Sequence, residues 1–286
     1  MFPRFKAFLR SLSGDKAGNI AILPMHGPIM AGKRGRQGMN LESMERQIAR
    51  AFTVPDLKAV ALSINSPGGS PVQSAMIMDR ILDLAKLTSV PVIAFTEDIA
   101  ASGGYMIALS ADEIIAHPAS LVGSIGVIYS GFGFSGVLKK YGVERRIHTA
   151  GKSKAFMDPF TAEKKADVDH LKGLQTELFK YFQDLVIERR GKRLKGSKTK
   201  VFSGLVWTSE EALKLGVIDG VGDMSTILKE RFGEKVRLVR IAPPKSLMGN
   251  LLGGSSAGST EDLSLFSADE LLNAVEARLH WSRWGL

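Results

Sequence analysis

The sequence predicts an α/β fold, in which strands alternate with crossover helices to form a layered β-sheet core. Short β-branched runs and longer segments of helical periodicity alternate from residue 19 to about residue 245. The chain has 286 residues, of which 44% are apolar, and this is enough for one large domain with appendages. Charged residues make up 23%, close to the value for ordinary globular proteins, so extensive disorder is not expected.

Several runs have the composition of strands, and three longer segments have the periodicity of helices. The expected strands are 19–23, 59–64, 91–95, 113–116, 121–129 and 145–148. The expected helices are 39–52, 74–87 and 162–189. The last helix should bury one face, because apolar side chains recur in it at spacings of three and four: Leu171, Leu174, Leu178, Phe182 and Leu185.

The N-terminal residues 1–18 are expected to form a basic extension in front of a main domain at 19–245. Basic and apolar residues alternate at its start without the continuous apolar core of a signal peptide. No run of about 18 apolar residues occurs that would span a membrane. Phe5, Phe8 and Leu9 suit a helix lying on a membrane surface, but a frayed terminus is the simpler interpretation.

Residues 246–286 are expected to form a linker and a C-terminal helix. Glycine, serine and asparagine crowd together at 249–259, which is typical of a linker. A capping-box pattern at 267–270, followed by apolar residues at helical spacing, predicts a helix over 267–282. Such a helix should dock on its own domain or on a neighbouring subunit.

The chain is basic, with 38 lysines and arginines against 29 acidic residues and a formal net charge of +9. This excess favours contact with anionic surfaces without selecting one of them. Seven of the basic residues lie at 189–200, where a solvated helix end and loop is the favoured interpretation and lipid binding the alternative. The absence of cysteine excludes disulfides and thiolate metal sites.

Two glycine-rich junctions follow predicted strands. The first, Asn65–Gly69, contains Pro67, Gly68 and Gly69, and such a turn can direct main-chain N–H groups into a cleft. The second places Ser102 between small residues at the start of a helix, where a serine is exposed. Either junction alone has an ordinary structural explanation, a steric turn or an N-cap serine. Together they favour a nucleophile beside an oxyanion hole.

A nucleophilic serine needs a general base. The five histidines, at 26, 117, 148, 170 and 280, show no recognisable triad spacing. Lys152 and Lys154 lie in a polar segment between a predicted strand and a predicted helix, although any lysine is more often a solvated surface charge. A lysine has an ordinary pKa of about 10.4, so acting as a base near neutrality requires that pKa to be lowered by about 3.

Four segments occur in the order seen in the signal peptide peptidase A family of serine peptidases: 65–69, 101–105, 122–127 and the segment of Lys154. The chain resembles a short, single-repeat form of this family, within the ClpP/crotonase superfamily. The resemblance implies a ClpP/crotonase-like fold, with Ser102 as nucleophile and Lys154 as base. Lys152 is the alternative base if the correspondence is shifted by two residues.

The resemblance also implies roles for the neighbours of the dyad. Ser124 would hydrogen-bond the lysine, and Gly68 or Gly69 would form the oxyanion hole with Gly103. No metal or other cofactor is implied. The implied substrates are peptides such as remnant signal peptides, and the implied assembly is a cyclic homo-oligomer, with eight copies as the expected ring size.

In this family the serine and lysine of one active site come from adjacent copies. Better-known members carry an N-terminal membrane anchor, which is not expected here. We therefore expect a cytoplasmic protein, with peripheral contact at the inner membrane surface as the alternative, and no nucleic-acid partner. The competing hypotheses are an inactive or membrane-associated scaffold of the same fold, a ClpP-like Ser-His-Asp peptidase and a crotonase-like acyl-CoA enzyme.

Overall fold

The computed structural model describes residues 18–31, 38–242 and 281–282, and the chain divides into two compact units. Unit 1 comprises residues 1–125 and 185–286, and unit 2 comprises residues 126–184. The expected N-terminal extension and linker lie outside the described residues, as does most of the expected C-terminal helix. Residues 281–282 are helical.

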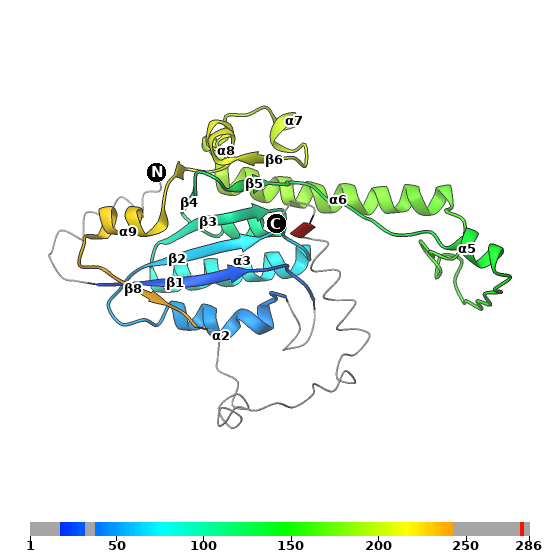
Figure 1. Cartoon of the computed structure of the whole chain (residues 1–286), viewed down its shortest axis with the longest axis horizontal. Helices are drawn as coiled ribbons and strands as arrows, with labels where there is room; N and C mark the ends of the chain where they lie inside the picture. The colour runs from blue at the N-terminus through cyan, green and yellow to red at the C-terminus, as the bar shows by residue number, and fades with distance from the viewer. Residues whose placement is uncertain (1–17, 32–37, 243–280, 283–286) are drawn as a thin grey trace, which may run out of the picture. The chain divides into compact units, whose positions relative to one another are not determined.

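Unit 1 is built on an eight-stranded sheet with the order β6-β5-β3-β2-β1-β8, in which β4 pairs with both β3 and β7 (Figure 1). All pairs are parallel except β5 with β6. Parallel pairing requires crossover connections, so the predicted α/β fold is confirmed. The strands are β1 (Asn19–His26), β2 (Leu57–Ser66), β3 (Val92–Ala101), β4 (Glu113–Ala116), β5 (Leu121–Gly123), β6 (Val206–Thr208), β7 (Gly220–Val221) and β8 (Arg237–Arg240).

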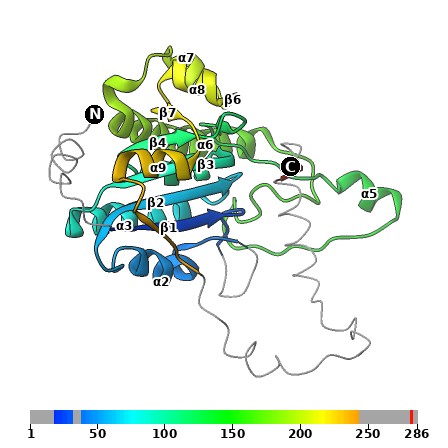
Figure 2. The same cartoon turned by 60° about the vertical axis from the view of Figure 1, so that its left-hand side comes forward.

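Helices cover the sheet of unit 1. Helix α9 (Met224–Phe232) lies against the sheet (Figure 2). Its Leu228 is fully buried in a cluster with alternate residues of the strands, among them Ile20, Ala61 and Phe95. Helix α2 (Leu41–Ala51) contacts β1, α4 (Gly103–Ala108) contacts β2 and β3, and α3 (Pro71–Thr88) contacts α2 and α4. The remaining helices of unit 1 are η1 (Gly191–Arg193), α7 (Lys198–Val201) and α8 (Ser209–Leu215).

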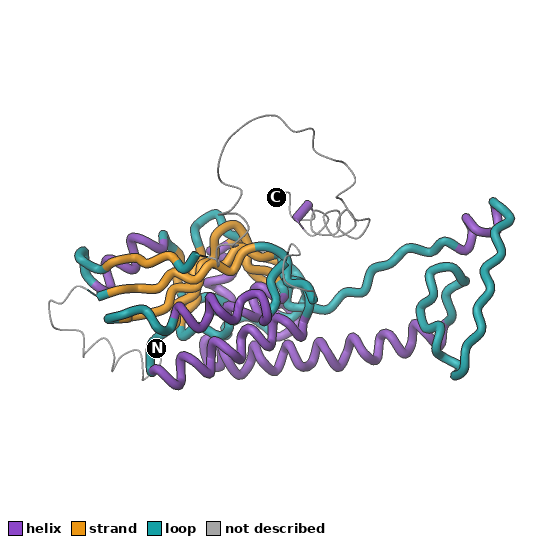
Figure 3. Tube along the Cα trace, turned by 90° about the horizontal axis from the view of Figure 1, so that it is seen from below, coloured by secondary structure: helices purple, strands orange, loops and turns teal. Residues whose placement is uncertain are grey.

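Unit 2 has little regular structure. It contains α5 (Ser135–Lys140) and most of α6 (Lys165–Arg190), and the rest of it consists of loops and turns (Figure 3). The strand expected at 145–148 is therefore wrong. The strand expected at 121–129 ends at Gly123, because Gly123 and Ser124 have φ angles of +129° and +52° that take the backbone out of the extended region.

Two further expectations are corrected. Phe182 is buried, but Leu174 and Leu178 are 42% and 43% exposed, so α6 does not bury one continuous apolar face within this chain. The basic segment at 189–200 is not simply solvated, because Arg190 is only 2% exposed and pairs with Asp219.

No helix in the described part of the chain is long and apolar enough to cross a membrane.

Candidate active site

Ser102 lies at the junction between β3 and α4. Its backbone has φ +52° and ψ −118°, a conformation that residues with a side chain rarely adopt. Its N–H donates to Gly123 O at 2.8 Å, and its carbonyl accepts from Met106 N at 2.9 Å. Such strain persists only where the surroundings fix the backbone, and it is concentrated at functional sites.

The side chain of Ser102 is not used as a helix cap. Ser102 occupies the N-cap position of α4, yet its side chain makes no capping hydrogen bond, and the residue is half-buried. By contrast, the side chains of Asn40 and Ser70 do cap α2 and α3. The N-cap explanation for Ser102 is therefore not supported, and its hydroxyl remains available for chemistry.

The two glycine-rich junctions are packed against each other. A Cβ atom on Gly68 would lie 2.8 Å from both Ser102 Cβ and Gly103 N, and one on Gly103 would lie 2.3 Å from Ser74 Oγ. Gly68 and Gly69 have φ angles of +97° and +142°, which favour glycine. Only glycine lets the two segments approach this closely, which explains the two glycine-rich motifs.

Two backbone N–H groups beside Ser102 have no acceptor among the described residues: those of Gly69 and Gly103. The N–H of Gly68 is already engaged, since it donates to Ser66 Oγ at 3.2 Å. The Cβ position of Gly103 lies 3.4 Å from Gly69 N, so the two residues are close neighbours. Unengaged amides next to a serine hydroxyl are what an oxyanion hole requires.

Ser124 leaves the same edge of the sheet as Ser102. Ala101 and Gly123 are paired residues of the parallel strands β3 and β5, and each serine directly follows one of them. Ser124 has φ +52°, and its N–H donates to Leu205 O at 2.7 Å. The structure thus brings together Ser102, Ser124 and the glycines within unit 1.

Lys152 and Lys154 lie in unit 2, in a segment of turns, and both are exposed. The backbone N–H of Lys154 donates to Gly151 O at 3.2 Å. The residues that follow are attached to α6: Phe156 packs edge-on against His170 with ring centroids 5.4 Å apart, and Met157 N donates to Asp167 at 3.4 Å. The local geometry of the lysine segment is therefore fixed within unit 2.

Asp158, four residues after Lys154, anchors this segment further. Its carboxylate pairs with Arg145, which also lies over the ring of Phe160 at 4.6 Å. The hydrogen bond from Arg145 holds the pKa of Asp158 below its ordinary value, so the carboxylate stays charged.

The described histidines of unit 1 are engaged elsewhere. His26 contacts Ser63 and Glu97, and His117 Nδ1 accepts from Ala119 N at 3.3 Å. Neither is paired with Ser102, as the histidine of a Ser-His-Asp peptidase built on that serine would be. Across residues 18–31, 38–242 and 281–282, no three histidine, aspartate or glutamate side chains are grouped as metal ligands would be.

A network of buried hydrogen bonds and ion pairs beside α4 was not expected from the sequence. Arg190 pairs with Asp219 at 2.7 Å, and the buried hydroxyl of Tyr105 donates to Val217 O at 2.6 Å. Tyr105 falls in the motif at 101–105, but its bond to Val217 and the pair of Arg190 with Asp219 join residues far apart in the sequence, so no local pattern predicts them.

Comparison with known proteins finds a family match and several relatives. The sequence profile of Peptidase family S49 matches residues 85–235. The chain is 32% identical over 212 residues to a Salmonella typhi protein named Protease 4, covering 73% of this chain and 33% of that protein. A solved structure of the 1510-N membrane-bound stomatin-specific protease, in a mutant form, has a TM-score of 0.51 at 19% identity, covering 80% of this chain and all of that one.

A Brucella abortus protein named Na(+)/H(+) antiporter NhaA is 47% identical over 272 residues, covering 93% of this chain. The chain spans only 37% of that protein's length. The shared segment contains the profile match. Because the name describes the whole of that longer protein, its activity is not carried over to this chain.

Proposed function

Because the chain belongs to peptidase family S49, we propose that it is a serine peptidase with Ser102 as its nucleophile and Lys154 as its general base. One observation carries the assignment of the nucleophile. Ser102 has a strained backbone and a hydroxyl without a capping role, and it lies beside two backbone amides that have no acceptor among the described residues.

In the proposed reaction, neutral Lys154 takes the proton of Ser102 Oγ as that oxygen bonds to a peptide carbonyl carbon. The carbonyl oxygen becomes an oxyanion, which accepts hydrogen bonds from the N–H groups of Gly69 and Gly103. The lysine then protonates the leaving amine as the C–N bond breaks. Water, activated by the same lysine, hydrolyses the acyl-enzyme. Ser124 accepts a hydrogen bond from the lysine and orients it.

Of the two glycines in the first junction, we assign the oxyanion role to Gly69. The N–H of Gly68 donates to Ser66 Oγ, whose own hydroxyl donates to Gly27 O at 2.7 Å. This pair of bonds supports a structural role for Gly68. Its contact with Ser102 then sets the distance between the two junctions.

The proposed assembly is a cyclic homo-oligomer, with eight copies as the expected ring size. Its support is the surface of unit 2, where large apolar side chains are 47–78% exposed. Large exposed apolar side chains that gather in one part of a chain are typical of surfaces that bind another protein. The members of this set, called here the apolar set of unit 2, are Ile128, Tyr129, Phe132, Val137, Tyr141 and Val143.

We further propose that the active site is completed between copies, with Lys154 of one copy acting on Ser102 of the next. The exposure of Lys154 within one chain supports this arrangement, because a neutral lysine needs a desolvated environment. The proposed substrates are peptides such as remnant signal peptides. The proposed location is cytoplasmic, with peripheral contact at the inner membrane surface.

Labelling with a serine-reactive phosphonate tests the central assignment. We expect one adduct per chain, located on Ser102 by mass spectrometry and absent from Ser102→Ala. An adduct on another serine would reassign the nucleophile. A folded protein that neither reacts nor hydrolyses peptides would favour the inactive scaffold.

A further inference from the structure

Helix α4 carries the proposed nucleophile on its N-terminal side, but it has only six residues. A helix this short does not hold its own position, because isolated helices need about 12 residues or more to be even marginally stable. All six residues of α4 are buried. The position of Ser102 and Gly103 therefore depends on what α4 is attached to.

The first attachment is Tyr105, one turn after Ser102. Its side chain is fully buried, and its hydroxyl donates to Val217 O at 2.6 Å. Burial raises the pKa of this phenol, so it stays protonated and remains a donor. A single hydrogen bond thus connects the first turn of α4 to the segment between α8 and β7.

The second attachment is Arg189, at the other end of α4. Its Nε donates to Leu109 O at 2.7 Å, and its Nη2 donates to Ala111 O at 3.2 Å. The last carbonyl groups of a helix have no partners inside the helix, and a cation near them is favourable. Arg189 therefore holds the C-terminal end of α4 and the turn that follows it.

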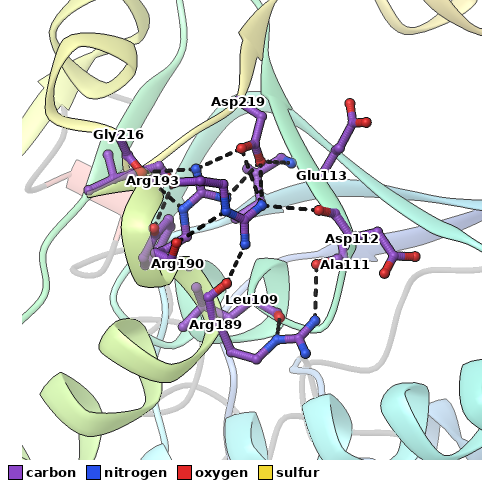
Figure 4. A network of polar contacts seen from close by, with 12 residues as sticks. Leu109, Ala111, Asp112, Glu113, Arg189, Arg190, Arg193, Gly216 and Asp219 are labelled. Atoms are coloured by element: carbon purple, nitrogen blue, oxygen red, sulfur yellow. Dashed lines mark hydrogen bonds and ion pairs between the residues drawn. The ribbon is translucent and has the colours of Figure 1, made fainter. Parts of the chain in front are cut away.

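The segment that receives Tyr105 is itself fixed. Arg190 donates to Gly216 O from Nε and Nη2, at 3.0 and 2.9 Å, and from Nη1 to Asp219 Oδ2 at 2.7 Å. The same carboxylate oxygen accepts from Ile114 N at 2.8 Å. Figure 4 shows Arg189 and Arg190 reaching these partners in different directions from the end of α6.

We propose that Tyr105 and Arg189 are positioning residues, which hold α4 so that Ser102 Oγ and Gly103 N–H stay aligned with Gly69 N–H. The proposal rests on the proposed role of Ser102. A strained residue keeps its conformation only when its surroundings over-determine it, and misplacement of a reacting group by 1 Å can cost about 100-fold in rate. Neither Tyr105 nor Arg189 contacts the substrate in this scheme.

Tyr105→Phe is the sharpest test, because it removes one buried oxygen atom and little volume. We expect kcat to fall about tenfold with KM unchanged, and the rate of phosphonate labelling at Ser102 to fall by the same factor. The pH profile should keep its shape, since the base is untouched. The control is Leu228→Val in α9, which should lower the Tm while leaving kcat and labelling unchanged.

Arg189 provides a second, independent variant. Arg189→Met should slow labelling, and Arg189→Lys should recover part of the rate, because lysine can still donate to one of the two carbonyls. Wild-type kcat and labelling rates in folded Tyr105→Phe and Arg189→Met would overturn the positioning role. If Ser102→Ala still hydrolysed peptides, the proposed function itself would fail; an inactive Ser102→Ala beside a normal Tyr105→Phe would remove only this inference.

Discussion

The two units differ in how they hold the residues proposed for catalysis. In unit 1 the backbone of Ser102 is hydrogen-bonded on both sides, and its neighbours are packed so closely that only glycine fits. In unit 2 Lys154 is exposed, and so are large apolar side chains of the same unit. A single chain therefore fixes the proposed nucleophile and oxyanion donors, whereas the proposed base has no desolvated surroundings within that chain.

Ser102→Ala is the most severe test of the site proposed in unit 1. We expect kcat for peptide hydrolysis to fall by at least about 10³-fold, because the attacking oxygen is lost. The fold should be unchanged by circular dichroism, since the hydroxyl has no capping partner. Ser225→Ala in α9 is a matched control that should keep full activity. A residual rate within tenfold of wild type would reject Ser102.

Substitutions of Lys152 and Lys154 test the base proposed in unit 2. Lys154→Ala should lose nearly as much activity as Ser102→Ala, whereas Lys152→Ala should stay within about threefold of wild type, because only Lys154 is the proposed general base. Steady-state kinetics of the two purified variants decides between them. An inactive Lys152→Ala beside an active Lys154→Ala would move the base by two residues.

A mixing experiment tests whether Ser102 of one copy acts together with Lys154 of another. Ser102→Ala and Lys154→Ala protein, mixed in equal amounts under subunit exchange, should recover activity. With random placement in a ring, about a quarter of the boundaries pair an intact serine with an intact lysine. Recovery towards a quarter of the wild-type rate is the expected result. No recovery, despite exchange demonstrated by mass spectrometry, would place both residues in one chain.

Much of unit 1 could be predicted because its signals are local. The parallel strands β2 and β3 end at Ser66 and Ala101, so the two junctions that follow them lie at one edge of the sheet and Gly68 packs against Ser102. The bond between Arg190 and Asp219 joins residues 29 positions apart, and seven basic residues in twelve suggested solvent instead. No local sequence pattern distinguishes a charged side chain on a solvated loop from one that forms buried hydrogen bonds and ion pairs.

Unit 2 was harder to predict for a different reason. The spacing of Leu174 and Leu178 correctly indicates an apolar side of α6, but periodicity does not say what covers that side, and within this chain neither leucine is buried. The strand expected at 145–148 does not form: Ile147 is the one β-branched residue of that run, and no strand in the described part of the chain pairs with it.

The exposed surface of unit 2 gives the next prediction. Phe132→Asp places a charge in the apolar set of unit 2 and should dissociate the assembly, measured by analytical ultracentrifugation, with a parallel loss of activity of about 100-fold. Leu87→Asp is the control, because Leu87 is 80% exposed in unit 1 and should tolerate the same change. A fully active monomer would contradict assembly through unit 2.

The smallest expected effect concerns stability and tests whether the Arg190–Asp219 pair supports unit 1. Asp219→Asn leaves the buried Arg190 without its carboxylate and should cost about 3 kcal/mol in the free energy of unfolding at pH 7, measured by urea denaturation. Glu211→Gln, which removes an exposed partner of Lys200, is the control and should cause no measurable loss.

The pH dependence of that loss identifies its cause. Burial alone would raise the pKa of Asp219, but the hydrogen bonds and charge of Arg190 and the Ile114 amide outweigh it and hold the pKa below its ordinary value. A lowered folded-state pKa stabilises the protein above the unfolded value of about 4, and this contribution is lost as the pH falls through the folded-state pKa. Wild type and Asp219→Asn should therefore converge in stability below about pH 4. A difference as large at pH 3 as at pH 7 would show that packing at residue 219, rather than its charge, stabilises this end of α6.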